Sequence, residues 1–167
     1  RNIYLKTQVL HAFAFMYKNK LQKYEVSKQY AFQSVSVNKK NNDVKGLIND
    51  YILLGKLFDY RVAKKYLFRA ETLADSIGDY AGKIEAQRIL FFYMLLEEKP
   101  AVTFAYVNNH PDMKGVFENT GPHFMDYMRA TVYSYGGMID SALVCFRAAE
   151  ESFKKAYDPV TKTEFFY

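Results

Sequence analysis

Apolar residues recur along much of the chain at the three- and four-residue spacing that places side chains on one face of a helix. Near the N-terminus this face is formed by Leu10, Phe13, Ala14 and Tyr17. Short turns rich in Asn, Asp, Gly or Pro separate the amphipathic segments. The pattern predicts an all-α protein made of helix pairs. The predicted pairs span about residues 3–39, 44–77, 80–109 and 122–157, and residues 160–167 are predicted to begin a further helix.

One stretch of the sequence occurs twice. Residues 60–70 repeat the Tyr, Val, Lys, Tyr and Phe positions of residues 24–34 at an offset of 36 residues. An Asp-x-x-Gly turn follows each copy, beginning at Asp43 and at Asp79, and a third such turn begins at Asp112. A fixed period of about 20–50 residues is the signature of a repeat protein. The sequence therefore predicts a single array of stacked helical repeats.

The second helix of the predicted pairs carries a small residue, a bulky one four positions later, and a small one three positions further on. The residues that carry this pattern are Ala63, Leu67 and Ala70, and again Ala142, Phe146 and Ala149. This arrangement resembles tetratricopeptide repeats, and the resemblance covers nearly the whole chain. The chain departs from the family in having no tryptophan and a shortened third pair. Its Gly-Asp turns look like the degenerate repeats of bacterial sensor and regulator proteins.

The resemblance implies a right-handed α-solenoid, a superhelix whose concave groove is lined by the first helix of each pair. In this family the groove holds an extended peptide or a partner's helix. The groove residues carried over by position are Lys20, Lys56, Arg88, Tyr127, Thr131 and Tyr135. The implied function is a protein- or peptide-binding scaffold, the sensing or interaction region of a larger regulatory protein. Lys and Arg would bind peptide carboxylates, and Tyr rings would pack on apolar parts of the peptide.

Charge is placed unevenly along the chain. The net charge is +5, and residues 1–42 alone hold eight basic residues and one acidic residue. Such asymmetry suits an acidic protein partner, and it also suits a basic nucleic-acid-binding helical array, which is the alternative function. We favour a simpler interpretation, a solvated basic face. Most of the 15 Tyr and 14 Phe residues fall at helical spacing beside apolar neighbours, which indicates core packing rather than base stacking.

The sequence carries no motif of an enzyme or of a cofactor site. The three histidines fall in different predicted elements and lack the spacing of metal ligands. Cys145 adjoins Phe146 and is interpreted as a core thiol. Phosphate-binding loops, nucleophile elbows and glycine fingerprints are missing. We therefore expect no catalytic activity, no metal and no cofactor.

The ends and the apolar runs of the chain bear on its context. The longest apolar run, Ile89–Leu96, is eight residues, far short of the roughly 20 that a membrane helix needs, so no membrane insertion is expected within this segment. The chain lacks a starting Met and ends in Phe165-Phe166-Tyr167, which suggests a piece of a longer protein. A structural spacer, or a homodimer formed through this end, is a further hypothesis. The single cysteine is compatible with the cytoplasm, and a periplasmic sensor region is the alternative location.

Overall fold

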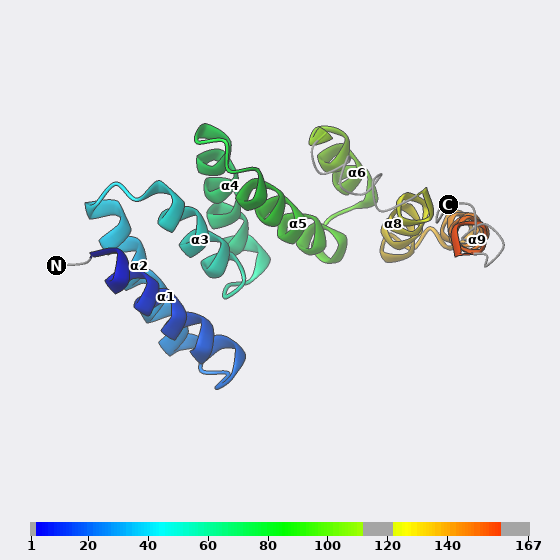
Figure 1. The fold of residues 1–167 in the computed structure, drawn as a ribbon. Coiled ribbons are helices and arrows are strands. Elements are labelled where there is room, and N and C mark those ends of the chain that lie inside the picture. The colour runs from blue at the N-terminus through cyan, green and yellow to red at the C-terminus, as the bar shows by residue number, and fades with distance from the viewer. Residues whose placement is uncertain (1–2, 112–121, 158–167) are drawn as a thin grey trace. The chain divides into compact units, whose positions relative to one another are not determined.

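The computed structural model describes residues 3–111 and 122–157, and these residues fold into helices without any strand (Figure 1). The all-helical class is therefore confirmed. The helices are α1 (Ile3–Asn19), α2 (Tyr24–Lys40), α3 (Val44–Gly55), α4 (Tyr60–Ser76), α5 (Tyr80–Glu97), α6 (Pro100–Asn108), α8 (Pro122–Tyr135) and α9 (Ile139–Tyr157). The third Asp-x-x-Gly turn and the helix predicted at 160–167 lie outside the described residues.

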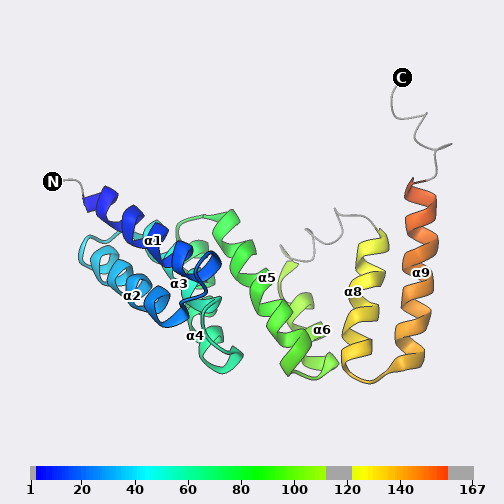
Figure 2. The same cartoon turned by 90° about the horizontal axis from the view of Figure 1, so that it is seen from below.

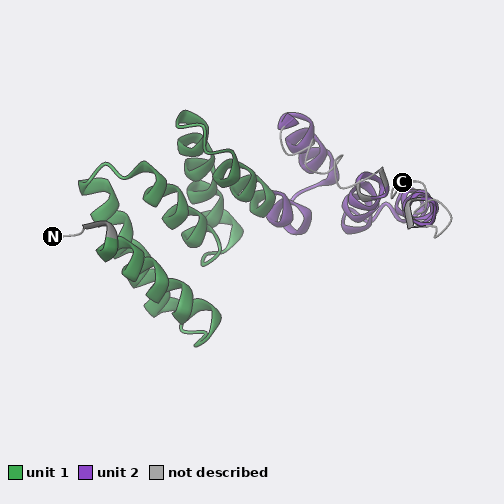
Figure 3. Ribbon diagram, in the orientation of Figure 1, with its two compact units in different colours: residues 1–90 green, residues 91–167 purple. Residues whose placement is uncertain are grey.

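The chain divides into two compact units, residues 1–90 and residues 91–167 (Figure 3). In the first unit α1 packs on α2, α3 packs on α4, and α2 joins the two pairs through its contact with α3. In the second unit α8 packs on α9 and α6 packs on α8. Figure 2 shows α1 beside α2, and α8 beside α9. Adjacent helices thus pack in pairs, as the sequence predicts, and α5 contributes its first part to one unit and its last part to the other.

The repeated Asp-x-x-Gly turn has two functions in the first unit. Its aspartate caps the next helix, since Asp43 accepts a hydrogen bond from the backbone N–H of Gly46 at 2.9 Å. Its glycine makes room for a side chain of the preceding helix, because a Cβ at Gly46 would lie 2.6 Å from Asn38 Nδ2. In the second copy the N–H of Gly82 donates to Asp79 at 3.2 Å, and a Cβ at Gly82 would lie 2.8 Å from Cγ2 of Ile48 in α3. The repeat therefore encodes both the start of a helix and its close approach to a neighbour.

The small-bulky-small pattern marks the buried face of α4. Ala63, Leu67, Ala70 and Ala74 are all fully buried. This face approaches α3 closely at Gly55, where an added Cβ would lie 2.4 Å from Leu67 Cδ2. The matching face of α9 in the second unit is less covered, since Ala142 is buried but the Phe146 side chain is 37% exposed.

Candidate functional site

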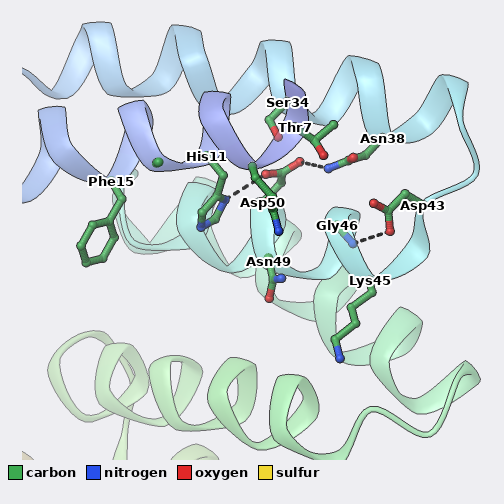
Figure 4. Close-up of a pocket in the computed structure, with 12 residues that line it drawn as sticks. Thr7, His11, Phe15, Ser34, Asn38, Asp43, Lys45, Gly46, Asn49 and Asp50 are labelled. Carbon is green, nitrogen blue, oxygen red and sulfur yellow. Dashed lines mark hydrogen bonds and ion pairs between the residues drawn. The ribbon is translucent and has the colours of Figure 1, made fainter. Parts of the chain in front are cut away.

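A cleft of about 610 Å³ lies between α1, α2 and α3 in the first unit (Figure 4). A second hollow of about 390 Å³ continues from it along α3 to the first turns of α5. The two hollows share His11, Phe15, Lys45 and Asn49. We call the combined surface the α1–α3–α5 groove. Most of its lining residues belong to α1, α3 and α5, which are the first helices of successive predicted pairs, and Ser34 and Asn38 belong to α2.

A buried carboxylate lies at the floor of the cleft. Asp50 is 1% exposed, and its Oδ2 accepts a hydrogen bond of 2.7 Å from Nδ2 of Asn38. Its Oδ1 lies 3.1 Å from Nδ1 of His11. Because a carboxylate can only accept, His11 carries its proton on Nδ1 in this contact, which leaves Nε2 of a neutral ring as an acceptor. Figure 4 shows these contacts joining α1, α2 and α3.

Two buried polar atoms at the floor are left without hydrogen-bond partners. They are Oδ1 of Asn38, a residue 1% exposed, and Oγ of Ser34, a residue 0% exposed. Both residues line the cleft. Buried polar groups are satisfied in more than about nine cases in ten, so each exception calls for an explanation. We call His11, Ser34, Asn38 and Asp50 together the Asp50 cluster.

Three lysines lie at the rim of the groove. Lys18 and Lys56 line its second part, and Lys45 lines both parts. The Lys56 ammonium is paired with Glu85 at 2.7 Å. No hydrogen bond or ion pair is found for Lys45 within the part of the chain that the structure describes. The rim can therefore donate to a carboxylate, while the floor is rich in acceptors.

Glu85 links two of the predicted groove residues. Its carboxylate accepts from Nζ of Lys56 at 2.7 Å and from Nε of Arg88 at 2.9 Å. Partial burial by itself raises the pKa of Glu85, but the hydrogen bonds and charges of Lys56 and Arg88 together outweigh it. The pKa of Glu85 is therefore lowered from its ordinary value of 4.5.

This shift predicts a small loss of stability in acid. A lowered pKa in the folded state contributes stability that is present above pH 4.5 and is lost as the pH falls through the lowered value. The pair is partly exposed, so we expect a contribution of only about 0–1 kcal/mol. Chemical denaturation of the parent and of Glu85→Gln at pH 7 and below pH 4 measures it. Their difference should shrink in acid and in high salt; a constant difference would contradict the assignment.

The other five predicted groove residues lie outside the two hollows, in the first unit or on α8. Lys20 is exposed in the turn after α1 and lines neither hollow, and Arg88 lines neither although it shares Glu85 with Lys56. Tyr127, Thr131 and Tyr135 belong to α8 in the second unit. Of the six residues, Lys56 alone lines the α1–α3–α5 groove.

The three predicted residues of α8 lie along one helix. The hydroxyl of Thr131 donates to the backbone oxygen of Tyr127 at 2.8 Å, so its hydrogen is already used within the helix. The Tyr127 ring packs edge-on against Phe146 of α9 at 5.9 Å. Tyr135 is 63% exposed near the end of the helix. These residues remain candidates for contacts made by the second unit.

Sequence reasoning missed the whole Asp50 cluster. Its members come from three helices, and His11 and Asp50 are 39 residues apart, so no local motif joins them. One signal was available: Asn49 and Asp50 interrupt the apolar segment that runs from Leu47 to Leu54. An acidic residue in such a position is buried only when it is paired.

A histidine, an aspartate and a serine in one cleft also call for comparison with a hydrolytic triad. Ser34 Oγ has no hydrogen-bond partner, so it is not bonded to His11 and the geometry gives no support for a serine activated by that ring. In the described ranges, no three His, Cys, Asp or Glu side chains are grouped so that they could hold a metal ion. That the chain is not an enzyme stays a prediction.

Two further findings extend beyond the groove. None of the helices in residues 3–111 and 122–157 combines the length and apolarity needed to cross a membrane. Comparisons with protein-family models, curated proteins and solved structures found no match. Any function must therefore be argued from the residues themselves.

Proposed function

We propose that the chain is a protein- or peptide-binding scaffold, a right-handed α-solenoid of tetratricopeptide-like pairs that forms the interaction region of a larger regulatory protein. The observation that carries the proposal is the α1–α3–α5 groove. It runs along the first helices of three successive pairs, and its rim holds Lys18, Lys45 and Lys56. A groove of this kind suits an extended peptide with acidic side chains.

The walls of the groove suit a peptide in other respects. Phe15 is 56% exposed at the rim, where an apolar side chain can pack against its ring. Asn49 is exposed and lines both hollows, so its amide can bond a peptide backbone. The apolar side chains of Ile52 and Leu53 line the second hollow. The groove thus offers charge, amide and apolar contacts along one line.

The test is binding of a fluorescein-labelled peptide of about ten residues rich in Asp, Glu and Leu, measured by anisotropy. Lys45→Glu should weaken binding by about tenfold or more, because it replaces an unpaired rim cation with an anion. Lys40→Glu changes the net charge equally and is the matched control, since Lys40 is exposed on α2 and lines neither hollow. Equal losses in both variants would contradict a specific groove.

The same assay addresses the nucleic-acid alternative. A labelled single-stranded oligonucleotide that bound more tightly than the peptide would favour it. Its affinity should then fall steeply with salt, with a log–log slope of about −0.7 per neutralised phosphate. Such a result would assign the basic residues of 1–42 to phosphate contacts and would overturn the peptide proposal.

A further inference from the structure

The unpartnered atoms of the Asp50 cluster define what the cleft can bind. The amide nitrogen of Asn38 donates to Asp50, and the unpartnered Asn38 Oδ1 is an amide oxygen that can only accept. The Asp50 carboxylate also only accepts. Ser34 Oγ can accept as well as donate. Three side chains at the floor of one cleft can therefore accept hydrogen bonds from a donor group of a ligand.

The negative charge of Asp50 further restricts the kind of group that the cleft can bind. A buried carboxylate disfavours any anion at the floor, and it favours a cation that can hydrogen-bond to it. A primary ammonium group has three N–H donors and no acceptor, which matches a set of three acceptor side chains. The cleft of about 610 Å³ is far larger than one ammonium group, so the residue that bears the group can enter with it. Ala12 and Phe15 supply apolar lining for that residue.

We propose that the cleft between α1, α2 and α3 binds a primary ammonium group through Asp50, Asn38 and Ser34, and that Lys45 at the rim meets a carboxylate of the same ligand. The inference rests on the proposed function and deepens it by naming the group that the peptide presents to the groove. Two sources share this chemistry: the α-amino group at a peptide N-terminus and the side chain of a lysine.

The test uses small probes and amide chemical shifts of the isotope-labelled chain. Glycinamide presents an α-ammonium group, and Nα-acetyl-lysine amide presents only a side-chain ammonium group. N-acetylglycinamide is the neutral control for the first probe. We expect saturable shifts at Ser34, Asn38, Gly46 and Asp50 with at least one ammonium probe. The probe that shifts these amides at the lower concentration identifies the source.

Variants of the chain test whether the probes bind through the proposed residues or through nonspecific charge attraction. Ser34→Ala removes one acceptor with little change in volume and should weaken probe binding by about fivefold or more. Ser36→Ala, on the exposed side of the same helix, should bind like the parent. Asp50→Asn keeps the shape and removes the charge, and it should abolish binding; if it does not fold, Ser34→Ala decides. Binding of neither ammonium probe, equal binding of N-acetylglycinamide, or an unaffected Ser34→Ala would overturn the proposal.

Failure of the ammonium-probe test can be distinguished from failure of the peptide-binding assay. If the acidic peptide binds in a Lys45-dependent way and no ammonium probe shifts the cleft, only the ammonium site fails. If an ammonium probe binds and no peptide does, the site stands as a small-molecule site and the scaffold function fails. An N-terminally acetylated copy of the acidic peptide, free of lysine, should bind more weakly than its unacetylated form if the α-amino group is the source.

Discussion

Replacing Leu67 with alanine is expected to lower the free energy of unfolding of the first unit by about 2–5 kcal/mol. Leu67 is 0% exposed and lies against the backbone of α3, where a Cβ at Gly55 would approach its Cδ2 to 2.4 Å. The substitution removes buried apolar area and leaves a cavity beside Gly55 of α3, which has no side chain to fill it. Denaturant unfolding followed by circular dichroism measures the loss. Phe68→Ala, at the adjacent and 42% exposed position, is the control and should lose less.

A double-mutant cycle with Gly55 identifies the cause. In the parent, Gly55→Ala should cost about 1–3 kcal/mol, because the new methyl group overpacks against Leu67. In the Leu67→Ala background the same change should cost nothing or stabilise by up to about 1 kcal/mol, since alanine is the better helix former. Additive effects in the cycle would show that the two residues are not in contact and would contradict the packing described for α3 and α4.

The second large effect is expected at the Asp50 cluster. Asp50→Ala should lower the free energy of unfolding by about 2–4 kcal/mol, because the Asn38 amide, buried at 1% exposure, loses its acceptor and a small cavity forms. His11 is partly exposed and can turn to water, so most of the penalty falls on Asn38. Thermal and denaturant unfolding measure the change.

Matched variants test whether this loss of stability comes from the buried hydrogen bonds of Asp50. Asn49→Ala, at the exposed neighbouring position, should change stability by less than about 0.5 kcal/mol. Asn38→Ala combined with Asp50→Ala should cost less than the sum of the two single changes, since the second removes a group that the first has already left unpaired. A loss in Asp50→Ala no greater than that in Asn49→Ala would show that the buried hydrogen bonds contribute nothing.

The helices could be predicted because their signals are local. The positions of Ala63, Leu67 and Ala70 specify one buried face of α4, and the structure buries all three. Asp43 and Asp59 precede their helices as capping residues, and each accepts a hydrogen bond from the third residue after it. Such features depend on spacings of three or four residues. They can be read from a sequence without knowledge of its tertiary contacts.

The candidate site could not be predicted in the same way. Ser34 occupies the small-residue position that corresponds to Ala70 in the repeat, so the repeat pattern accounts for its size and assigns nothing to its hydroxyl. The family resemblance predicts Lys56 as a groove residue from its position, but it does not predict the partner Glu85, which lies 29 residues further on. The polar side chains that meet at the floor of the cleft are determined by how one helix pair stacks on the next. That stacking is decided by close approaches such as that of Gly46 to Asn38, which no local pattern reveals.

The cleft is made by two helix pairs together: His11 and Asn38 come from the first pair, and Asp50 comes from the second. A ligand that bridges these residues can bind only while the two pairs are docked. Occupancy and docking are therefore thermodynamically linked, and a ligand present at one hundred times its Kd would add about 2.7 kcal/mol to the free energy needed to separate the pairs. By the same reciprocity, any substitution that loosens the contact between α2 and α3 lowers the affinity of the cleft without touching the ligand.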